Sequence, residues 1–172
     1  MNDIDSMRHM AFDAAFAARA DDLLCRPRCP DDVDFLIHCA IACSPLAGML
    51  PDAMIAQQAA FQRAGHDGAH PDAMHRIVLR GGMAVGHILV AWGAGSTHLV
   101  DIAVLPGFQG AGAGSQMLGA WLDVADTYRL TATLEVRADN PARRLYARLG
   151  FVETDVDPWA LIIDLHRPPN QR

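Results

Sequence analysis

Lysine is absent from this sequence, and glutamate is nearly absent. All 14 basic residues among the 172 are arginine, and only Glu135 and Glu153 among the 20 acidic residues are not aspartate. A chain without lysine cannot carry a phosphate-binding loop of the Walker type, a Schiff-base lysine or a lysine general base. Any catalytic groups must therefore come from other residue types.

Long apolar runs and targeting signals are missing as well. No stretch reaches the roughly 18 uninterrupted apolar residues that a transmembrane helix needs. The first residues include Asp3, Asp5 and Asp13 and have neither a basic segment nor an apolar core, which argues against secretory and mitochondrial targeting. We expect a cytoplasmic protein that has no membrane partner.

An excess of positive charge is also lacking. The formal net charge is −6, whereas binding to nucleic acid needs a concentrated excess of cations. Apolar residues make up 51% of the chain and charged residues 20%, which is typical of a globular protein with a real core. Because the length predicts one domain, we expect a single globular unit that does not bind nucleic acid.

The four cysteines do not have the spacing of a common metal site. They are Cys25, Cys29, Cys39 and Cys43. Zinc sites usually use pairs separated by two residues, whereas each pair here is separated by three. Cys39 and Cys43 fall one turn apart on an expected helix, where small thiols pack well. Since disulfides are rare in a reducing compartment, we expect neither a metal nor a disulfide.

The pattern of apolar residues predicts helices first, then strands, then an alternation of the two. We expect helices over residues 2–20, 30–43 and 51–65, an edge strand over 23–28 and a loop over 66–71. An antiparallel meander follows, with strands over 75–80, 84–92 and 98–105. The last elements are a helix over 112–128, a strand over 131–137, a helix over 140–149 and a pair of strands from 151 to 165. This order implies a mixed sheet with helices packed on it, in the α/β (α+β) class.

A glycine-dense segment, residues 102–116, carries the clearest chemical signal. It reads IAVLPGFQGAGAGSQ, so that a strand ends, a loop follows and a helix begins near Gly112. Such a loop directs backbone N–H groups at one point, and the helix N-terminus adds a positive partial charge, which suits a phosphate or pyrophosphate. A dinucleotide-binding turn, G-x-G-x-x-G, would need glycine where Ser115 stands, and too little chain follows for its sheet.

Two motifs in this half of the chain resemble those of one superfamily. The run QGAGAG, from Gln109 to Gly114, matches the Q/R-x-x-G-x-G/A signature of the GCN5-related N-acetyltransferases (GNAT). The run NPARRLYARLGF, from Asn140 to Phe151, is similar to a later element of that superfamily that ends in L-Y-x-x-x-G-F. The resemblance extends more weakly, through element order, over about residues 23–165.

The resemblance implies a GNAT fold, in which a mixed, mostly antiparallel, twisted sheet of about six to seven strands is flanked by helices. Residues 1–20 would be an N-terminal helical extension, 21–166 the acetyltransferase domain and 167–172 a tail. The implied activity is acetyl-CoA-dependent transfer of an acetyl group directly to a primary amine of a small molecule or peptide. The alternative is a non-catalytic acyl-CoA-binding sensor or regulatory module of the same fold.

The resemblance also implies a set of cofactor-binding residues. The backbone of the fourth strand would hold the pantetheine arm and the acetyl carbonyl at Ile102, Ala103 and Val104. Backbone N–H groups of the loop would hold the pyrophosphate of acetyl-CoA, from Gln109, Gly110, Ala111, Gly112, Ala113, Gly114 and Ser115. The side chain of Asn140 would contact the cofactor arm, and Arg143 would reach a cofactor phosphate.

Tyr146 and a base on the fourth strand are the implied catalytic residues. Tyr146 stands where the family places a phenol that can protonate the leaving thiolate. Many relatives carry a glutamate base four residues before the first bulge residue of the fourth strand, where this chain has His98. Asp101 is the second candidate, on the opposite face from His98 if the strand pairing is regular. Water is the third, because an acceptor amine of low pKa needs no dedicated base.

The expected partners are therefore acetyl-CoA as co-substrate and an amine acceptor, with no metal and with a homodimer left open. Because the chain has no lysine, it cannot acetylate side-chain amines of its own.

Overall fold

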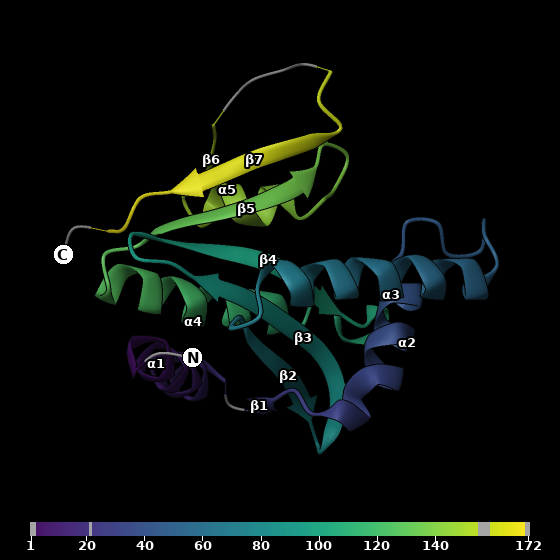
Figure 1. The fold of residues 1–172 in the computed structure, drawn as a ribbon, viewed down its shortest axis with the longest axis horizontal. Helices are drawn as coiled ribbons and strands as arrows, with labels where there is room; N and C mark the ends of the chain where they lie inside the picture. The colour runs from purple at the N-terminus through teal and green to yellow at the C-terminus, as the bar shows by residue number, and fades with distance from the viewer. Residues whose placement is uncertain (1–2, 21, 155–158, 171–172) are drawn as a thin grey trace.

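One mixed sheet of seven strands forms the centre of the fold in the computed structural model, which describes residues 3–20, 22–154 and 159–170 (Figure 1). The strand order is β1-β2-β3-β4-β5-β7-β6. The strands are β1 (Leu23–Pro27), β2 (Met74–Arg80), β3 (Met83–Trp92), β4 (Ser96–Val104), β5 (Thr131–Arg137), β6 (Val152–Glu153) and β7 (Ile162–Arg167). Strands β4 and β5 pair in parallel, and the other neighbouring strands pair antiparallel. The predicted fold class is thus confirmed.

Helices cover both faces of this sheet. They are α1 (Asp3–Arg19), α2 (Val33–Cys43), α3 (Asp52–Ala69), α4 (Ala113–Thr127) and α5 (Arg143–Arg148), with short 3-10 turns η1 (Pro30–Asp32) and η2 (Pro106–Phe108). On one face, Trp121 of α4 donates from Nε1 to Oγ1 of Thr97 on β4 at 2.9 Å. On the other face, the next strand residue, His98, stacks against His70, which ends α3. Helices α2 and α3 therefore lie opposite α1 and α4 (Figure 1).

Helix α1 is part of the main core. Its Phe12 and Phe16 are 0% and 1% exposed and belong to the same cluster of buried side chains as Trp121. At its end, the Arg19 guanidinium and the Asp123 carboxylate of α4 pair at 2.6 Å. Gly119 of α4 lies under this arginine, because an added Cβ would meet the Arg19 guanidinium at 3.0 Å. Helix α1 is thus anchored to the core through its buried face and its end.

The gap between β4 and β5 positions the functional residues. Parallel pairing joins only the first four residues of β4, Ser96 to Leu99, to Thr131 through Leu134 of β5. From Asp101 to Val104, β4 pairs with β3 on one side, and no described strand pairs with it on the side of β5. A strand edge is a row of unpaired N–H and C=O groups, so backbone groups of Ile102 and Ala103 on this side can bind a ligand.

A bulge in β4 overturns the expectation that His98 and Asp101 lie on opposite faces. Ala91 and Leu89 of β3 pair with His98 and Asp101, so Val100 is one residue more than regular pairing allows. Because Ala91 and Leu89 are two residues apart, they share a face, and so do their partners. His98 and Asp101 therefore both face α2 and α3.

Three helix boundaries differ by three or more residues from the sequence prediction. Helix α2 begins at Val33 rather than at residue 30, because Pro30–Asp32 form the 3-10 turn η1. Helix α3 does not stop at Gly65 but runs to Ala69, so residues 66–69 of the expected loop are helical. An added Cβ at Gly65 would meet nothing within 4 Å, so no neighbouring group requires a glycine here, and the helix continues past it. Helix α5 begins at Arg143 rather than at Asn140, because the Asn140 Oδ1 accepts the Ala142 N–H at 2.9 Å in a turn before the helix.

Four short segments lie outside the described residues: residues 1–2 of the predicted extension, residue 21, residues 155–158 between the closing strands and residues 171–172 of the predicted tail. The predicted boundaries at 20 and 166 stay predictions. None of the described helices combines the length and the apolar character needed to cross a bilayer.

Candidate active site

The glycine-rich loop and the first turn of α4 line a cavity of about 730 Å³. Gly110 and Gly112 have φ angles of 76° and 88°, which favour glycine, and an added Cβ at Gly110 would meet nothing within 4 Å. Gly112 is the N-cap of α4 and offers no side chain to bind the N–H groups of the first turn. These donors and the helix dipole make the cavity suitable for an anionic phosphate. The residues present therefore fit the pyrophosphate of acetyl-CoA.

Most of the predicted cofactor-binding residues are brought together in this phosphate cavity. Its lining includes Ile102, Ala103, Val104, Gln109, Gly110, Gly112, Ala113, Gly114, Ser115, Asn140 and Tyr146. The Gln109 side chain closes the loop, since its Nε2 donates to the Val104 carbonyl oxygen at 2.8 Å. Ala111 does not line the phosphate cavity, although it lies within the same loop.

Arg143 lies apart from the phosphate cavity. It donates to the Ala138 carbonyl oxygen at 2.8 Å and pairs with Glu153, and it lines a separate cavity behind α5. Arg148, which the sequence analysis did not select, lines the phosphate cavity instead. The two arginines are five positions apart on a short helix, so they lie on different sides of it.

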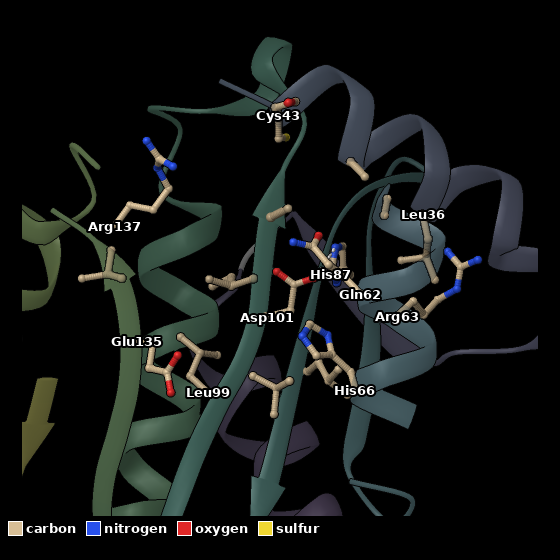
Figure 2. Close-up of a pocket in the computed structure, with 18 of the residues that line it drawn as sticks. Leu36, Cys43, Gln62, Arg63, His66, His87, Leu99, Asp101, Glu135 and Arg137 are labelled. Atoms are coloured by element: carbon tan, nitrogen blue, oxygen red, sulfur yellow. Dashed lines mark ion pairs between the residues drawn. The ribbon is translucent and has the colours of Figure 1, made fainter. Parts of the chain in front are cut away.

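A second cavity, of about 510 Å³, lies between the sheet and helices α2 and α3 (Figure 2). We call it the acceptor cleft. Its floor comes from β2 to β5 and its wall from α2 and α3, including Arg63 and His66. Figure 2 shows Asp101 at the centre of the cleft, with His66 and His87 on one side and Glu135 of β5 on the other. The cleft therefore combines carboxylate, imidazole and guanidinium groups on one surface.

The acceptor cleft and the phosphate cavity share a short list of lining residues. Both are lined by Cys43, Pro45, Ile102, Ala103, Arg137, Asn140 and Tyr146. The Cys43 thiol donates to the Val104 carbonyl oxygen at 3.3 Å, which fixes the end of α2 against β4. A molecule lying in the phosphate cavity and one lying in the cleft would meet at the open edge of β4, beside Tyr146.

Tyr146 is 5% exposed at this meeting point. Its ring packs edge-on against Phe151, with the centroids 6.0 Å apart. Burial, with a smaller contribution from the negative charge of Asp101, raises the pKa of Tyr146 to about 12. The phenol therefore stays protonated at neutral pH and can act as an acid.

His98 lines neither the cleft nor the phosphate cavity, although it was the first sequence candidate for the base. Its Nδ1 lies 2.9 Å from Oγ1 of Thr133, and its ring centroid lies 6.3 Å from that of His70. Burial lowers the pKa of His98. Asp101, the second candidate, does line the cleft, and its side chain is 48% exposed.

Glu135 is a cleft residue that the sequence analysis missed as a candidate. It faces the cleft from β5, while its neighbours Leu134 and Val136 are buried in the core. Strand alternation over residues 131–137 was the signal that could have placed it on the open face. Two carboxylates, on β4 and β5, thus face the cleft near Tyr146.

The described part of the chain holds no cluster of three or more metal-ligating side chains. The four cysteines are free thiols.

A family model and a curated protein each match part of this chain. A family model described as the Acetyltransferase (GNAT) family matches residues 44–151. Among curated proteins, the ribosomal protein bS18-alanine N-acetyltransferase of Haemophilus influenzae is 42% identical over 59 residues, which are 34% of this chain and 40% of that protein. The aligned part is thus less than half of that relative's length.

Solved structures show the same fold over nearly the whole chain. PaiA N-acetyltransferase from Thermoplasma acidophilum, in complex with coenzyme A, has a TM-score of 0.68 at 16% identity and covers 85% of this chain and 98% of its own. The ribosomal-protein-S18-alanine N-acetyltransferase from Escherichia coli has a TM-score of 0.64 at 20% identity, with 87% and 96% covered. At such identities these likenesses concern the fold alone.

Proposed function

Because this chain belongs to the GNAT family of acetyltransferases, we propose that it transfers an acetyl group from acetyl-CoA directly to a primary amine. One observation carries the proposal. The phosphate cavity and the acceptor cleft meet at Ile102 and Ala103, on the unpaired edge of β4, with the protonated Tyr146 phenol beside them. This arrangement lets two substrates approach each other from opposite sides.

The chain's own groups would hold acetyl-CoA in the phosphate cavity and along the unpaired edge of β4. N–H groups of the loop and of the first turn of α4 bind its pyrophosphate, and Arg148 adds a positive charge at the same cavity. The free edge of β4 binds the pantetheine arm. When bound, acetyl-CoA supplies an acetyl group as a thioester whose sulfur leaves as a thiolate.

Proton transfer needs one acid and one base near the transfer point. Tyr146 donates its O–H proton to the leaving sulfur, because it lies where the two cavities meet and its phenol is protonated at neutral pH. The amine must lose a proton, and we assign this task to Asp101 and Glu135 together, because both carboxylates line the cleft. His98 has no part in this assignment.

The class of the acceptor amine is to be identified with a panel of amines. The curated relative from Haemophilus influenzae is named for alanine, whose single amine in a protein is the N-terminal α-amino group. A test panel should therefore include a peptide that begins with alanine, a lysine-containing peptide with a blocked N-terminus and small primary amines. Because the chain has no lysine, any acetyl-lysine detected belongs to a substrate.

Acetyl-CoA is expected to raise the melting temperature of the protein. At a ligand concentration of 100 Kd, binding adds about 2.7 kcal/mol to the unfolding free energy, or about 5–10 °C. Arg148→Ala should weaken binding about fivefold, while Arg143→Ala, the matched control, changes Kd by less than about twofold. No thermal shift at millimolar acetyl-CoA would contradict the cofactor assignment.

Turnover on the amine panel tests the reaction itself. We expect Asp101→Asn and Glu135→Gln each to lower kcat/KM about 10-fold, and the double variant to lose more than either alone, because one carboxylate partly replaces the other. His98→Ala should change kcat/KM by less than about twofold. Tight acetyl-CoA binding without turnover on any amine would instead favour a non-catalytic acyl-CoA-binding module.

A further inference from the structure

Three polar side chains from three neighbouring strands form a row under the acceptor cleft. His75 of β2 and His87 of β3 approach each other with Nε2 and Nδ1 3.3 Å apart. The other ring nitrogen of His87, Nε2, lies 3.8 Å from Oδ2 of Asp101 on β4 (Figure 2). The row therefore leads from a half-buried imidazole, through a buried one, to the carboxylate at the centre of the cleft.

The middle residue of the row is buried, whereas its end in the cleft is exposed. The His87 side chain is 7% exposed, whereas that of Asp101 is 48% exposed. A buried imidazole costs stability unless its nitrogens find partners, and Nδ1 of His87 finds one in His75 at 3.3 Å. Its Nε2 faces the Asp101 carboxylate at 3.8 Å, which is longer than a hydrogen bond but close enough for the ring to feel the carboxylate charge.

The charge state of the row follows from its surroundings. Burial lowers the pKa of His87, a shift that Arg28 supports and Asp101 opposes. Burial and the neighbouring His87 lower the pKa of His75 to about 3, with Arg28 and Arg63 acting in the same direction and Asp32 against it. Both imidazoles are therefore neutral in the pH range of an enzyme assay.

Neutral imidazoles next to a carboxylate can donate in only one favourable direction. The negative carboxylate attracts the positive end of an N–H dipole, which favours the tautomer of His87 with its proton on Nε2, the nitrogen that faces Asp101. Its Nδ1 then accepts from the Nε2–H of His75. Each N–H in the row points toward Asp101.

We propose that His75 and His87 are positioning residues, which orient the Asp101 carboxylate toward the amino group of the acceptor. The proposal rests on the proposed function, because it assumes that an amine occupies the cleft. It goes beyond that function by giving two residues outside the proton-transfer groups a defined effect on the reaction. Asp101 touches the substrate, and the two histidines act through it.

Kinetics of His87 variants, alone and combined with Asp101→Asn, test the proposal. His87→Leu removes the N–H group that faces Asp101 and should lower kcat/KM about 10-fold, because the carboxylate is no longer oriented from behind. His87→Gln keeps an N–H group at this position and should recover most of the activity. In the Asp101→Asn background, His87→Leu should add less than about twofold. Equal losses with and without Asp101, or no recovery in His87→Gln, would overturn the proposal.

A spectroscopic readout covers the case in which His87→Leu does not fold or no amine is turned over. Histidine ¹⁵N spectra of the wild-type protein should show neutral Nε2–H tautomers for His75 and His87, with the His87 signal altered in Asp101→Asn. Unaltered His87 signals in that variant would contradict the coupling. If the spectra behave as expected but no amine on the panel is acetylated, the proposed function fails while the row itself stands.

Discussion

Replacing Tyr146 with phenylalanine is expected to lower kcat about 100-fold or more while changing the Kd of acetyl-CoA by less than about twofold. Phenylalanine preserves the edge-on contact with Phe151 and the packing of a side chain that is 5% exposed. It removes only the O–H that would protonate the leaving sulfur. A loss of 100-fold corresponds to about 2.7 kcal/mol of transition-state stabilisation, which is in the range of one well-placed acid. Single-turnover kinetics and a thermal shift with acetyl-CoA separate the two effects.

The pH dependence gives this prediction a second arm. With its pKa raised to about 12, Tyr146 keeps its proton as the pH rises through the ordinary tyrosine value of 10. Loss of the Tyr146 proton therefore should not limit wild-type turnover below about pH 11. Unchanged turnover in Tyr146→Phe would remove Tyr146 as the acid. A basic limb near pH 10 that this variant abolishes would contradict the raised pKa of Tyr146.

Phe12→Ala is expected to lower the free energy of unfolding by about 3–5 kcal/mol, although residue 12 lies outside the motifs and outside the matched family segment. The Phe12 ring is 0% exposed and stacks with Phe16 at a centroid distance of 6.1 Å. Truncation leaves a cavity between α1 and α4 that the anchored helix cannot easily close. Since a domain is usually stable by about 5–15 kcal/mol, a loss of this size is a large part of the total.

Met10→Ala is the matched control for Phe12→Ala. Met10 lies on the same helix but is 64% exposed, so its truncation should change the unfolding free energy by less than about 0.5 kcal/mol. Urea unfolding of the two variants measures the difference. If both variants had wild-type stability, helix α1 would be a dispensable appendage, as the term N-terminal extension suggests, rather than part of the core.

The sequence predicted the fold well where the signal is local. Gly112 has a positive φ directly before a helix, a conformation that favours glycine and depends only on neighbouring residues. The loop at 109–114, with the exception of Ala111, lines the phosphate cavity. The end of α3 was misjudged because Gly65, a common helix terminator, is simply tolerated in an exposed helix at a cost of about 1 kcal/mol. Asn140 was assigned to a helix, but its side chain caps the turn before it.

The candidate bases show why the arrangement of the cleft could not be predicted from the sequence. His98 was selected from its resemblance to the position of the family's glutamate, and Asp101 was placed on the opposite face on the assumption of regular pairing. The bulge at Val100 depends on β3, because it is the register of Leu89 and Val90 that leaves one residue of β4 unpaired. Glu135 reaches the cleft because β5 lies parallel to β4 and then separates from it. Neither pairing is encoded within a window of a few residues.

The sequence by itself determined the groups that are available and the local shapes they can take: a lysine-free chain, a glycine loop that leaves N–H donors free at a helix start, and a tyrosine within a recognisable motif. The tertiary structure decided which of these groups meet. It placed Asp101 and Glu135 in one cleft, removed His98 from it and aligned His75 and His87 behind Asp101. The physical reason is that side-chain identity and backbone freedom are properties of single residues, whereas facing direction, burial and charge state depend on strands that pair across long stretches of sequence.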